Sequence, residues 1–365
     1  MAERTSVDNA APIPPGSGGA ESLRTRDFEY PLDERLIAQR PLRDRDASRL
    51  LHVRRVEGDF VDRTFRDLAS LIPPGDVLVL NDTRVFPARL IGRKSSGAAA
   101  EVLLIERLDA AGTRWRALVR PGGKLKPGRV VEIAADLRAI VEETVEGGGR
   151  LVRLESRLPP DQAIARYGHV PLPPYIRRPD DEADRGRYQT IYACARGSVA
   201  APTAGLHFSD DLLSAIEARG AEIAKVTLHV GPGTFRPVEA EDPGRHHLDA
   251  EWYRVTPQAA ETVNRARARG SAVWAVGTTT VRTLETAVGA DGRLSPGEGT
   301  TDLFIRPGFR FRAVDRLVTN FHLPRSTLLM LVAGFAGHDL TMAAYRHAAE
   351  AGYRFYSYGD AMVVT

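Results

Sequence analysis

The sequence is poor in the residues that build disulfides, metal cages and membrane spans. Its 365 residues include one cysteine, Cys194, so no intrachain disulfide and no cage of several thiolates can form. The longest apolar run, "TLLMLVAGFAG" from Thr327, is shorter than the ~18 residues that a membrane-spanning helix needs. We therefore expect a protein of the reducing cytoplasm with no membrane span, and a buried helix at this run.

Short motifs that mark common enzyme classes are also missing. There is no GxGxxG, no GxxxxGKS or GxxxxGKT, and no GxSxG. The defining features of dinucleotide-binding proteins, P-loop nucleotidases and serine hydrolases are therefore lacking. The nine histidines include no HExxH spacing, and with a single cysteine available we expect no metal site.

Lysine is scarce as well, since four of the 50 basic residues are lysines, yet the basic charge is unevenly spread. The whole chain has a net charge of +3, which is too small to indicate nucleic-acid binding by itself. Between Arg84 and Lys126, however, there are ten basic and three acidic residues. This segment is either a surface for phosphate groups or the solvated exterior of a folded unit.

The periodicity of apolar residues divides the chain into different kinds of structure. Residues 1–26 are polar and rich in proline, glycine and serine, which predicts a disordered extension. From residue 74 to 160, six strand-length runs begin with "DVLVL" and end with "RLVRLES", and they favour a small antiparallel β-barrel. After Pro171 helices and strands alternate, which is typical of an α/β fold.

In the α/β part, apolar strands repeatedly end in loops of small polar residues. "TLHV" leads into "GPGTF", "WAV" into "GTTTVR", "LVT" into "NFHLPRST" and "YSY" into "GDAM", and a further strand is expected at "DLFI". Ligands of α/β proteins bind in the crevice at the carboxyl ends of the strands. The four loops are therefore predicted to converge on one site.

Three histidines, His207, His229 and His322, lie in or beside these loops. Imidazole titrates near neutral pH, so a shared pocket could use them in proton transfer or as hydrogen-bond donors. His207 stands in "AAPTAGLHF", before a helix that is predicted to begin after Ser209 and to end at Gly220. The alternative for each histidine is a packed structural role.

The loop "VGTTTVRTLE" predicts an anion site at the start of a helix. Gly277, Thr278 and Thr279 would offer backbone N–H groups to a carboxylate or phosphate. Arg282 would lie one turn further along as a charged clamp. Capping by a threonine explains the threonines equally well, but it leaves Arg282 unexplained.

Two further stretches carry candidate binding residues. The strand "VLVL" runs into a polar tetrad, Asn81, Asp82, Thr83 and Arg84, for which the simpler alternative is an Asx turn. The rings of "YRFYSYGDAM" alternate in direction. One set is expected in the core, and the other, which includes Tyr358, in a pocket wall.

Nine blocks of the sequence, taken in order, closely resemble one enzyme family. They run from about Asp27 to Val364 and read "FEYPLDERLIAQRPLRDRDASRLL", "LVLNDTRVFPARL", "GHVPLPPYIRR", "YQTIYA", "VAAPTAGLHF", "VTLHVGPGTFRPV", "VGTTTVRTLE", "VTNFHLPRSTLLMLVAGFAG" and "YRFYSYGDAM". The family is that of the S-adenosylmethionine:tRNA ribosyltransferase-isomerases of queuosine biosynthesis. Blocks of this length are far more specific than any short motif.

The resemblance implies a discontinuous α/β catalytic domain, residues 27–73 and 161–365, with an inserted antiparallel β-barrel domain at 74–160. It implies a monomeric transferase that moves and isomerises the ribosyl moiety of S-adenosylmethionine onto 7-aminomethyl-7-deazaguanine at the tRNA wobble position. The products would be epoxyqueuosine-tRNA, adenine and methionine. S-adenosylmethionine is then a consumed substrate, and no true cofactor is expected.

Under this resemblance, acid and base chemistry is expected from His207, His229 and His322, with Asp82 or Asp360 in support. Arg282 and the turn from Gly277 to Thr280 would hold an anion such as the methionine carboxylate. Further substrate contacts are expected from Asn81, Thr83, Arg84, Thr203, Asn320 and Tyr358. The phosphates of the anticodon stem-loop would lie on Arg89, Arg93, Lys124 and Lys126.

Two positions depart from the family's pattern, and two other functions stay open. "SSGAAAEVLL" lacks an expected glycine and lysine, and Asp249 stands where a histidine is common. The alternatives are a non-catalytic RNA-binding protein and an S-adenosylmethionine-dependent RNA methyltransferase. Residues 74–160 contain only Phe86 and Trp115 as aromatic residues, which disfavours a barrel that binds RNA by base stacking.

Overall fold

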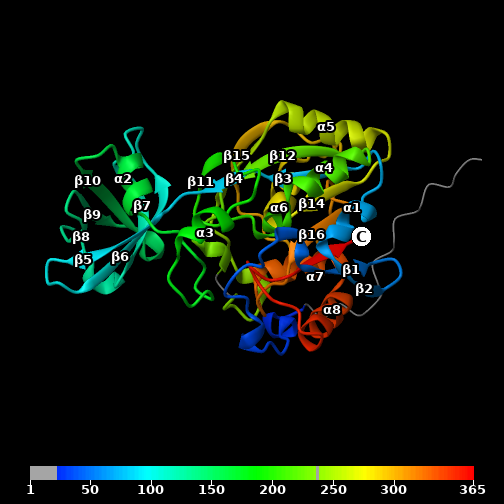
Figure 1. The fold of residues 1–365 in the computed structure, drawn as a ribbon, viewed down its shortest axis with the longest axis horizontal. Coiled ribbons are helices and arrows are strands. Elements are labelled where there is room, and N and C mark those ends of the chain that lie inside the picture. The colour runs from blue at the N-terminus through cyan, green and yellow to red at the C-terminus, as the bar shows by residue number, and fades with distance from the viewer. Residues whose placement is uncertain (1–22, 236–237) are drawn as a thin grey trace, which may run out of the picture.

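The computed structural model describes residues 23–235 and 238–365, which form a large α/β unit with a β-barrel beside it (Figure 1). Most of the expected extension, residues 1–22, lies outside the described residues. The described chain takes up regular structure before residue 27, since Thr25–Phe28 forms a 3-10 helix. The backbone N–H of Thr25 donates to the carbonyl of Glu241, which fixes this start against the α/β unit.

The α/β unit is built on a nine-stranded sheet in which four adjacent strands, β12, β3, β14 and β16, run parallel. The strands, in spatial order, are β15 (Gly297–Thr301), β13 (Glu251–Val255), β12 (Glu222–Leu228), β3 (Val77–Asn81), β14 (Val273–Val276), β16 (Arg316–Asn320), β17 (Ala361–Val364), β1 (Arg49–Arg54) and β2 (Asp59–Thr64). β17 runs antiparallel to β16. Parallel neighbours need crossover connections, and most of these contain helices.

Helices cover both faces of the sheet. On one face lie α5 (Pro257–Ala268), α6 (Thr278–Ala287), α7 (Thr327–Ala336) and α8 (His338–Glu350), and on the other α1 (Leu68–Leu71) and α4 (Asp210–Ala218). Val77 and Val79 of β3 pack into the first core, and Leu78 and Leu80 into the second. Burial on both sides explains why β3 is a continuous apolar run.

α7 is the buried helix predicted from "TLLMLVAGFAG". Within the described residues, no single helix is long and apolar enough to cross a membrane. α7 and α8 meet that test only as a pair, which is bent by 117°. α4 likewise begins after Ser209, as predicted, and the hydroxyl of Ser209 caps it by accepting from the N–H of Leu212.

The β-barrel is closed and has six antiparallel strands, as predicted. In order round the barrel these are β10 (Arg150–Ser156), β7 (Arg114–Arg120), β6 (Ala99–Arg107), β5 (Arg89–Lys94), β8 (Val130–Ala134) and β9 (Leu137–Thr144). α2 (Pro160–Tyr167) packs Ala163 and Ile164 into the barrel core. The short parallel strands β4 (Thr83–Val85) and β11 (Ala195–Ser198) lie where the barrel joins the α/β unit (Figure 1).

The expected placement of "DVLVL" in the barrel is wrong. These residues form β3 in the large sheet, between β12 and β14, and the remaining strand of the barrel is β5. A short apolar run fits a buried central strand and a barrel strand equally well, so periodicity alone does not decide between them. The barrel strands span residues 89–156, so the chain leaves the α/β unit after β4 and not at residue 74.

Two expected strands, "DLFI" and "YRFYSY", are irregular segments. The sheet uses residues next to them instead, in β15 and β17. In the first segment, the carbonyl of Leu303 turns towards the guanidinium of Arg282. In the second, Tyr356 has a φ of 71°, and the carboxylate of Asp360 accepts from two backbone amides, so the chain bends before β17.

Substitution of Asp76 provides a test of how the central strands are held together. Its buried carboxylate accepts from the indole N–H of Trp274 and the backbone N–H of Ala272, each at 2.8 Å. Asp76→Ala leaves both donors unpaired, so we expect the free energy of unfolding to fall by about 2–4 kcal/mol. The control, Asp302→Ala at an exposed carboxylate, should change it by less than about 0.5 kcal/mol. Equal denaturation midpoints for the two variants would contradict this role of Asp76.

Candidate active site

The carboxyl ends of β12, β3, β14 and β16 meet at one edge of the sheet, because these parallel strands are neighbours. The loops after them begin at His229, Asp82, Gly277 and Phe321. β17 enters from the opposite direction, and its first residue, Ala361, pairs with Asn320. The segment before β17 therefore reaches the same edge. Polar loops from distant parts of the chain come together here.

The side chain of Asn81, at the end of β3, ties three of these loops together. Its Oδ1 accepts from the backbone N–H groups of Thr83 and Leu228, both at 3.1 Å. Its Nδ2 donates at 3.1 Å to the carbonyl of Leu228 and to Oγ1 of Thr279. The amide is buried and uses its full hydrogen-bonding capacity. This geometry favours a structural role for Asn81, which holds the loops together, instead of the expected contact with substrate.

Between the loops lies a cleft, formed by two adjoining hollows of about 30 Å³ each, that we call the strand-end cleft. Its lining includes these predicted site residues: Thr203, Gly277, Thr278, Thr279, Asn320 and His322. Gly277, with a φ of 87°, turns β14 into α6, and only glycine adopts such a conformation without strain. The structure thus brings together part of the predicted site.

His322 lies in the strand-end cleft with one ring nitrogen bound to the protein. Nε2 shares a hydrogen bond of 2.8 Å with Oγ1 of Thr319, whereas Nδ1 has no hydrogen-bond partner within the described residues. Burial lowers the pKa of His322 to about 3. The imidazole is therefore neutral at pH 7.

Asn320 connects the strand-end cleft with His207. Its Nδ2 donates to Nε2 of His207 at 2.9 Å and lies 3.3 Å from the carbonyls of Tyr356 and Asp360. Three acceptors around Nδ2 define the orientation of the amide. Its Oδ1 is buried without a hydrogen-bond partner in the described part of the chain. Because an unpaired buried oxygen is costly, Asn320 is suited to receive a donor group of a ligand.

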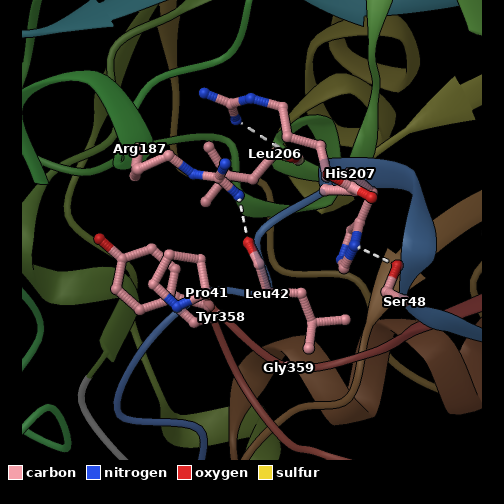
Figure 2. Close-up of a pocket in the computed structure, with 11 residues that line it drawn as sticks. Pro41, Leu42, Ser48, Arg187, Leu206, His207, Tyr358 and Gly359 are labelled. Carbon is pink, nitrogen blue, oxygen red and sulfur yellow. Dashed lines mark hydrogen bonds between the residues drawn. The ribbon is translucent and has the colours of Figure 1, made fainter. Parts of the chain in front are cut away.

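His207 is held on both sides, and Figure 2 shows its ring directed at Ser48. Nδ1 lies 2.7 Å from Oγ of Ser48, and the ring stacks on Phe65 with centroids 4.9 Å apart. Because Nε2 accepts from Asn320, the proton resides on Nδ1 and is donated to Ser48. Burial lowers the pKa of His207 to about 3. The geometry therefore favours a role for His207 in orienting the side chain of Asn320, instead of the expected acid or base chemistry.

His229 faces a different space, a cavity of about 590 Å³ between the barrel and the α/β unit, which we call the interdomain cavity. Burial lowers the pKa of His229 to about 4, with a smaller contribution from Arg254. Val230 lines both the interdomain cavity and the strand-end cleft. The two spaces are therefore neighbours on either side of the chain at Val230.

Arg282 is buried in the wall of a second interdomain space of about 230 Å³. Its guanidinium forms an ion pair with Glu251 and donates to the carbonyls of Leu303 and Thr301. Glu251 also accepts from the backbone N–H of Gly231. These contacts occupy guanidinium N–H groups that Arg282 would need to bind a ligand anion as expected. The geometry therefore favours a role for Arg282 in fixing the loop after β12.

The other predicted site residues of the α/β unit are engaged elsewhere or exposed. Oδ1 of Asp82 accepts from the hydroxyl of Thr227, and the carboxylate of Asp360 holds the bend before β17. Tyr358 lines the hollow of Figure 2 and donates to Asp184. Arg84 is exposed. Within the described residues, no group of three or more His, Cys, Asp or Glu side chains is placed to hold a metal ion.

The predicted RNA contacts of the barrel differ in their availability. Arg89 forms an ion pair with Glu101 at 2.9 Å. Arg93, Lys124 and Lys126 are exposed, and none of them forms an ion pair within the described residues. Lys124 and Lys126 flank the buried Leu125, so the loop between β7 and β8 offers the clearest surface for phosphate groups.

Sequence reasoning missed Gly197 and Trp252, which shape the surroundings of His229. A Cβ at position 197 would lie 2.4 Å from Nε2 of His229, and the indole of Trp252 stacks on the imidazole at 4.9 Å. Gly197 lies on β11 and Trp252 on β13. No motif in the sequence links the two, because only the fold brings these strands to one cavity.

The fold and the site define an α/β enzyme whose ligand cleft lies at the carboxyl ends of parallel strands, with a basic barrel beside it. Residues 25–364 match the family described as "Queuosine biosynthesis protein". The chain is 53% identical over 344 residues to the S-adenosylmethionine:tRNA ribosyltransferase-isomerase of Symbiobacterium thermophilum, which covers 94% of this chain and 100% of that one. It is 52% identical over 347 residues to the enzyme of the same name from Anaeromyxobacter dehalogenans, at 94% and 99% coverage.

A solved structure agrees with these relatives. The crystal structure of S-adenosylmethionine tRNA ribosyltransferase from Thermotoga maritima has 39% sequence identity and a TM-score of 0.53, and the match covers 93% of this chain and 100% of that one. The chain therefore belongs to the family of S-adenosylmethionine:tRNA ribosyltransferase-isomerases of queuosine biosynthesis, and it is an enzyme of the transferase class. The resemblance seen in the sequence is confirmed.

The low pKa of His207 predicts a pH dependence of stability. Its folded value of about 3 lies below the value of ~6.5 in an unfolded chain. The unfolded state therefore binds more protons, and stability is lost as the pH falls below ~6.5. His207→Gln should reduce this slope between pH 4.5 and 6 by up to about 1.4 kcal/mol per pH unit, measured by urea denaturation. His247→Gln, at an exposed histidine, is the control, and an unchanged slope in His207→Gln would refute the assignment.

Proposed function

We propose that this enzyme transfers and isomerises the ribosyl moiety of S-adenosylmethionine onto 7-aminomethyl-7-deazaguanine at the wobble position of tRNA. Epoxyqueuosine-tRNA, adenine and methionine are the products, and no true cofactor takes part. The proposal is carried by one observation: a polar cleft at the strand ends adjoins a large cavity beside the barrel, and Val230 lines both. The enzyme acts as a monomer in the cytoplasm and holds the anticodon stem-loop.

The strand-end cleft offers the contacts that S-adenosylmethionine requires. The first N–H groups of α6, at Thr278 and Thr279, have no partner within the helix and favour the methionine carboxylate. The free Oδ1 of Asn320 accepts from an ammonium or a ribose hydroxyl. Hollows of about 30 Å³ hold only part of this substrate. Its ribose therefore lies near Val230, where it can meet the RNA base.

His322 supplies the base for the first step. The positive sulfonium acidifies the hydrogens of the adjacent 5′ carbon of the ribose. With the ring proton on Nε2 and donated to Thr319, the unpartnered Nδ1 of His322 accepts one of these hydrogens as a proton. The ribose ring then opens and adenine leaves, taking up a proton. The amine of the deazaguanine adds to C4′ of the opened chain and loses a proton, and the C5′ carbanion that results attacks the C1′ aldehyde to close a five-carbon ring. The new alkoxide then displaces methionine from C5′ and forms the epoxide.

The structure disfavours a non-catalytic RNA-binding protein. The two aromatic residues of the barrel segment, Phe86 and Trp115, are 3% and 5% exposed and belong to the barrel core. Neither ring is therefore exposed on the outer surface of the barrel, where the bases of a single-stranded RNA would stack. A methyltransferase would release S-adenosylhomocysteine, whereas the proposed reaction releases free adenine and methionine. Analysis of the products formed with modified tRNA decides between these functions.

His322→Gln tests the proposed base. Because the substitution removes the proton acceptor and leaves the cleft otherwise intact, kcat for adenine release should fall at least about 100-fold. The KM for S-adenosylmethionine should stay within about threefold, since the substrate contacts remain. The control is His247→Gln, at an exposed position outside the cleft. A kcat within twofold of the unmodified enzyme would remove His322 from the mechanism.

The double variant Lys124→Ala and Lys126→Ala tests the RNA surface. Each phosphate contact contributes about 0.7–0.9 to the slope of log K against log salt concentration, so the slope for tRNA binding should fall by about 1–2. The KM for S-adenosylmethionine should not change. Lys225→Ala, at an exposed lysine of β12, is the control. Unaltered tRNA affinity and salt dependence in the double variant would place the RNA elsewhere.

A further inference from the structure

The interdomain cavity has the size and the walls of a nucleotide site. Its volume of about 590 Å³ lies within the ~300–1,000 Å³ typical of ligand pockets. Apolar walls come from Phe86, Trp115 and Trp252. The cavity lies between the barrel and the α/β unit, and it shares the lining residue Val230 with the strand-end cleft.

Charged groups of both signs line this cavity. Asp161 lies 3.3 Å from Arg107 and 3.4 Å from Arg196, and Glu106 lies 2.7 Å from Arg116. These side chains are 37–54% exposed, so the pairs are weak and can exchange partners. Such a set suits a ligand that carries an anionic phosphate and a cationic amine together, since the arginines can hold one and the carboxylates the other.

His229 presents one ring nitrogen, Nε2, to the cavity. Oγ1 of Thr83 lies 2.7 Å from Nδ1 of His229 and 3.4 Å from the carbonyl of Ala195. When this hydroxyl donates to the carbonyl, it accepts from Nδ1–H, and in that tautomer the lone pair of the imidazole lies on Nε2. Within the described residues, Nε2 has no hydrogen-bond partner.

Gly197 keeps this acceptor accessible. Because a Cβ at position 197 would lie 2.4 Å from Nε2 of His229, any larger residue there would clash with the imidazole and displace it. Trp252 stacks on the imidazole at 4.9 Å and 24° and fixes its plane. The ring is therefore oriented by Thr83 and Trp252 and left open by Gly197.

A chain of hydrogen bonds links His229 to the strand-end cleft. Thr83 binds His229 through its hydroxyl and Asn81 through its backbone N–H, and Asn81 binds Oγ1 of Thr279. The acceptor at Nε2 is thus held at a fixed position relative to the cleft. Under the proposed function, a group bound at Nε2 then stands beside the ribose of S-adenosylmethionine.

From this geometry we propose that the interdomain cavity recognises the wobble nucleotide, and that Nε2 of His229 accepts a hydrogen bond from its exocyclic aminomethyl group. His229 then distinguishes the 7-aminomethyl-7-deazaguanine nucleotide from guanosine, which has no such donor at that position. This inference rests on the proposed function and adds to it the place and the specificity of the second substrate.

The test compares the affinities of two anticodon stem-loop RNAs that differ only in 7-aminomethyl-7-deazaguanine or guanine at the wobble position. Without S-adenosylmethionine, the unmodified enzyme should bind the first RNA about 10- to 100-fold more tightly, the range for a hydrogen bond to a charged group. Thr83→Val keeps the shape of the side chain but releases the tautomer of His229, so this preference should largely disappear. Thr300→Val, at another threonine of the same cavity, should keep it.

Gly197→Ala is the second variant, because its Cβ would lie 2.4 Å from Nε2 and therefore forces the imidazole out of the position that presents this nitrogen to the cavity. It should also lose the preference, whereas Gly186→Ala, where an added Cβ meets nothing within 4 Å, should not. Melting temperatures close to that of the unmodified enzyme establish that the variants are folded. An unchanged preference in folded Thr83→Val and Gly197→Ala overturns the inference.

A raised KM for S-adenosylmethionine in these variants, with the RNA preference intact, also overturns the inference, because the cavity would then hold the sulfonium substrate. Failure of the proposed function is a separate result. In that case the unmodified enzyme releases no adenine from S-adenosylmethionine with the modified tRNA, whatever the relative affinities of the two RNAs.

Discussion

The four hydrogen bonds of the Asn81 side chain are the constraint on which the arrangement of the site depends. They join the end of β3 to the end of β12, to the first turn of α6 and to Thr83. Because the amide is buried, each of these bonds would be costly to break without a replacement. The strand-end cleft and the interdomain cavity therefore keep a fixed relation to each other, with Thr279 on one side and His229 on the other.

Burial gives the three site histidines one protonation state but different surroundings. The pKa values of His207, His229 and His322 all lie well below the ordinary value for histidine, so each ring is neutral at physiological pH. His207 has both nitrogens bound to the protein, whereas His229 and His322 each have one nitrogen free of partners among the described residues. The three histidines therefore share the charge of the ring and differ in their hydrogen-bond partners.

Much of the fold was predictable, because its signals are local. α7 follows from an apolar run, α4 from the cap at Ser209, and the barrel from short runs divided by turns. The placement of β3 was not predictable, since its apolar residues suit either unit. The bend at Tyr356 was not predictable, because alternating aromatic residues are typical of a strand. The contacts that hold the bend come from the carboxylate of Asp360.

The candidate site was predictable in its loops but not in its contacts. Polar residues after apolar strands indicated Thr278, Asn320 and His322 correctly as neighbours. The ion pair of Arg282 with Glu251 was not predictable, because no sequence motif connects their elements. The same holds for the space that Gly197 leaves beside His229. Residue types alone do not show whether a polar group is already satisfied by the protein, and this decides its availability to a ligand.

The most direct measurement is a crystal structure of the enzyme with a bound S-adenosylmethionine analogue such as S-adenosylhomocysteine. The account predicts the amino-acid carboxylate at the N–H groups of Thr278 and Thr279, and the 5′ carbon within about 4 Å of Nδ1 of His322. The purine should point past Val230. An analogue bound in the hollow beside His207, or held by the guanidinium of Arg282 away from His322, would contradict the account.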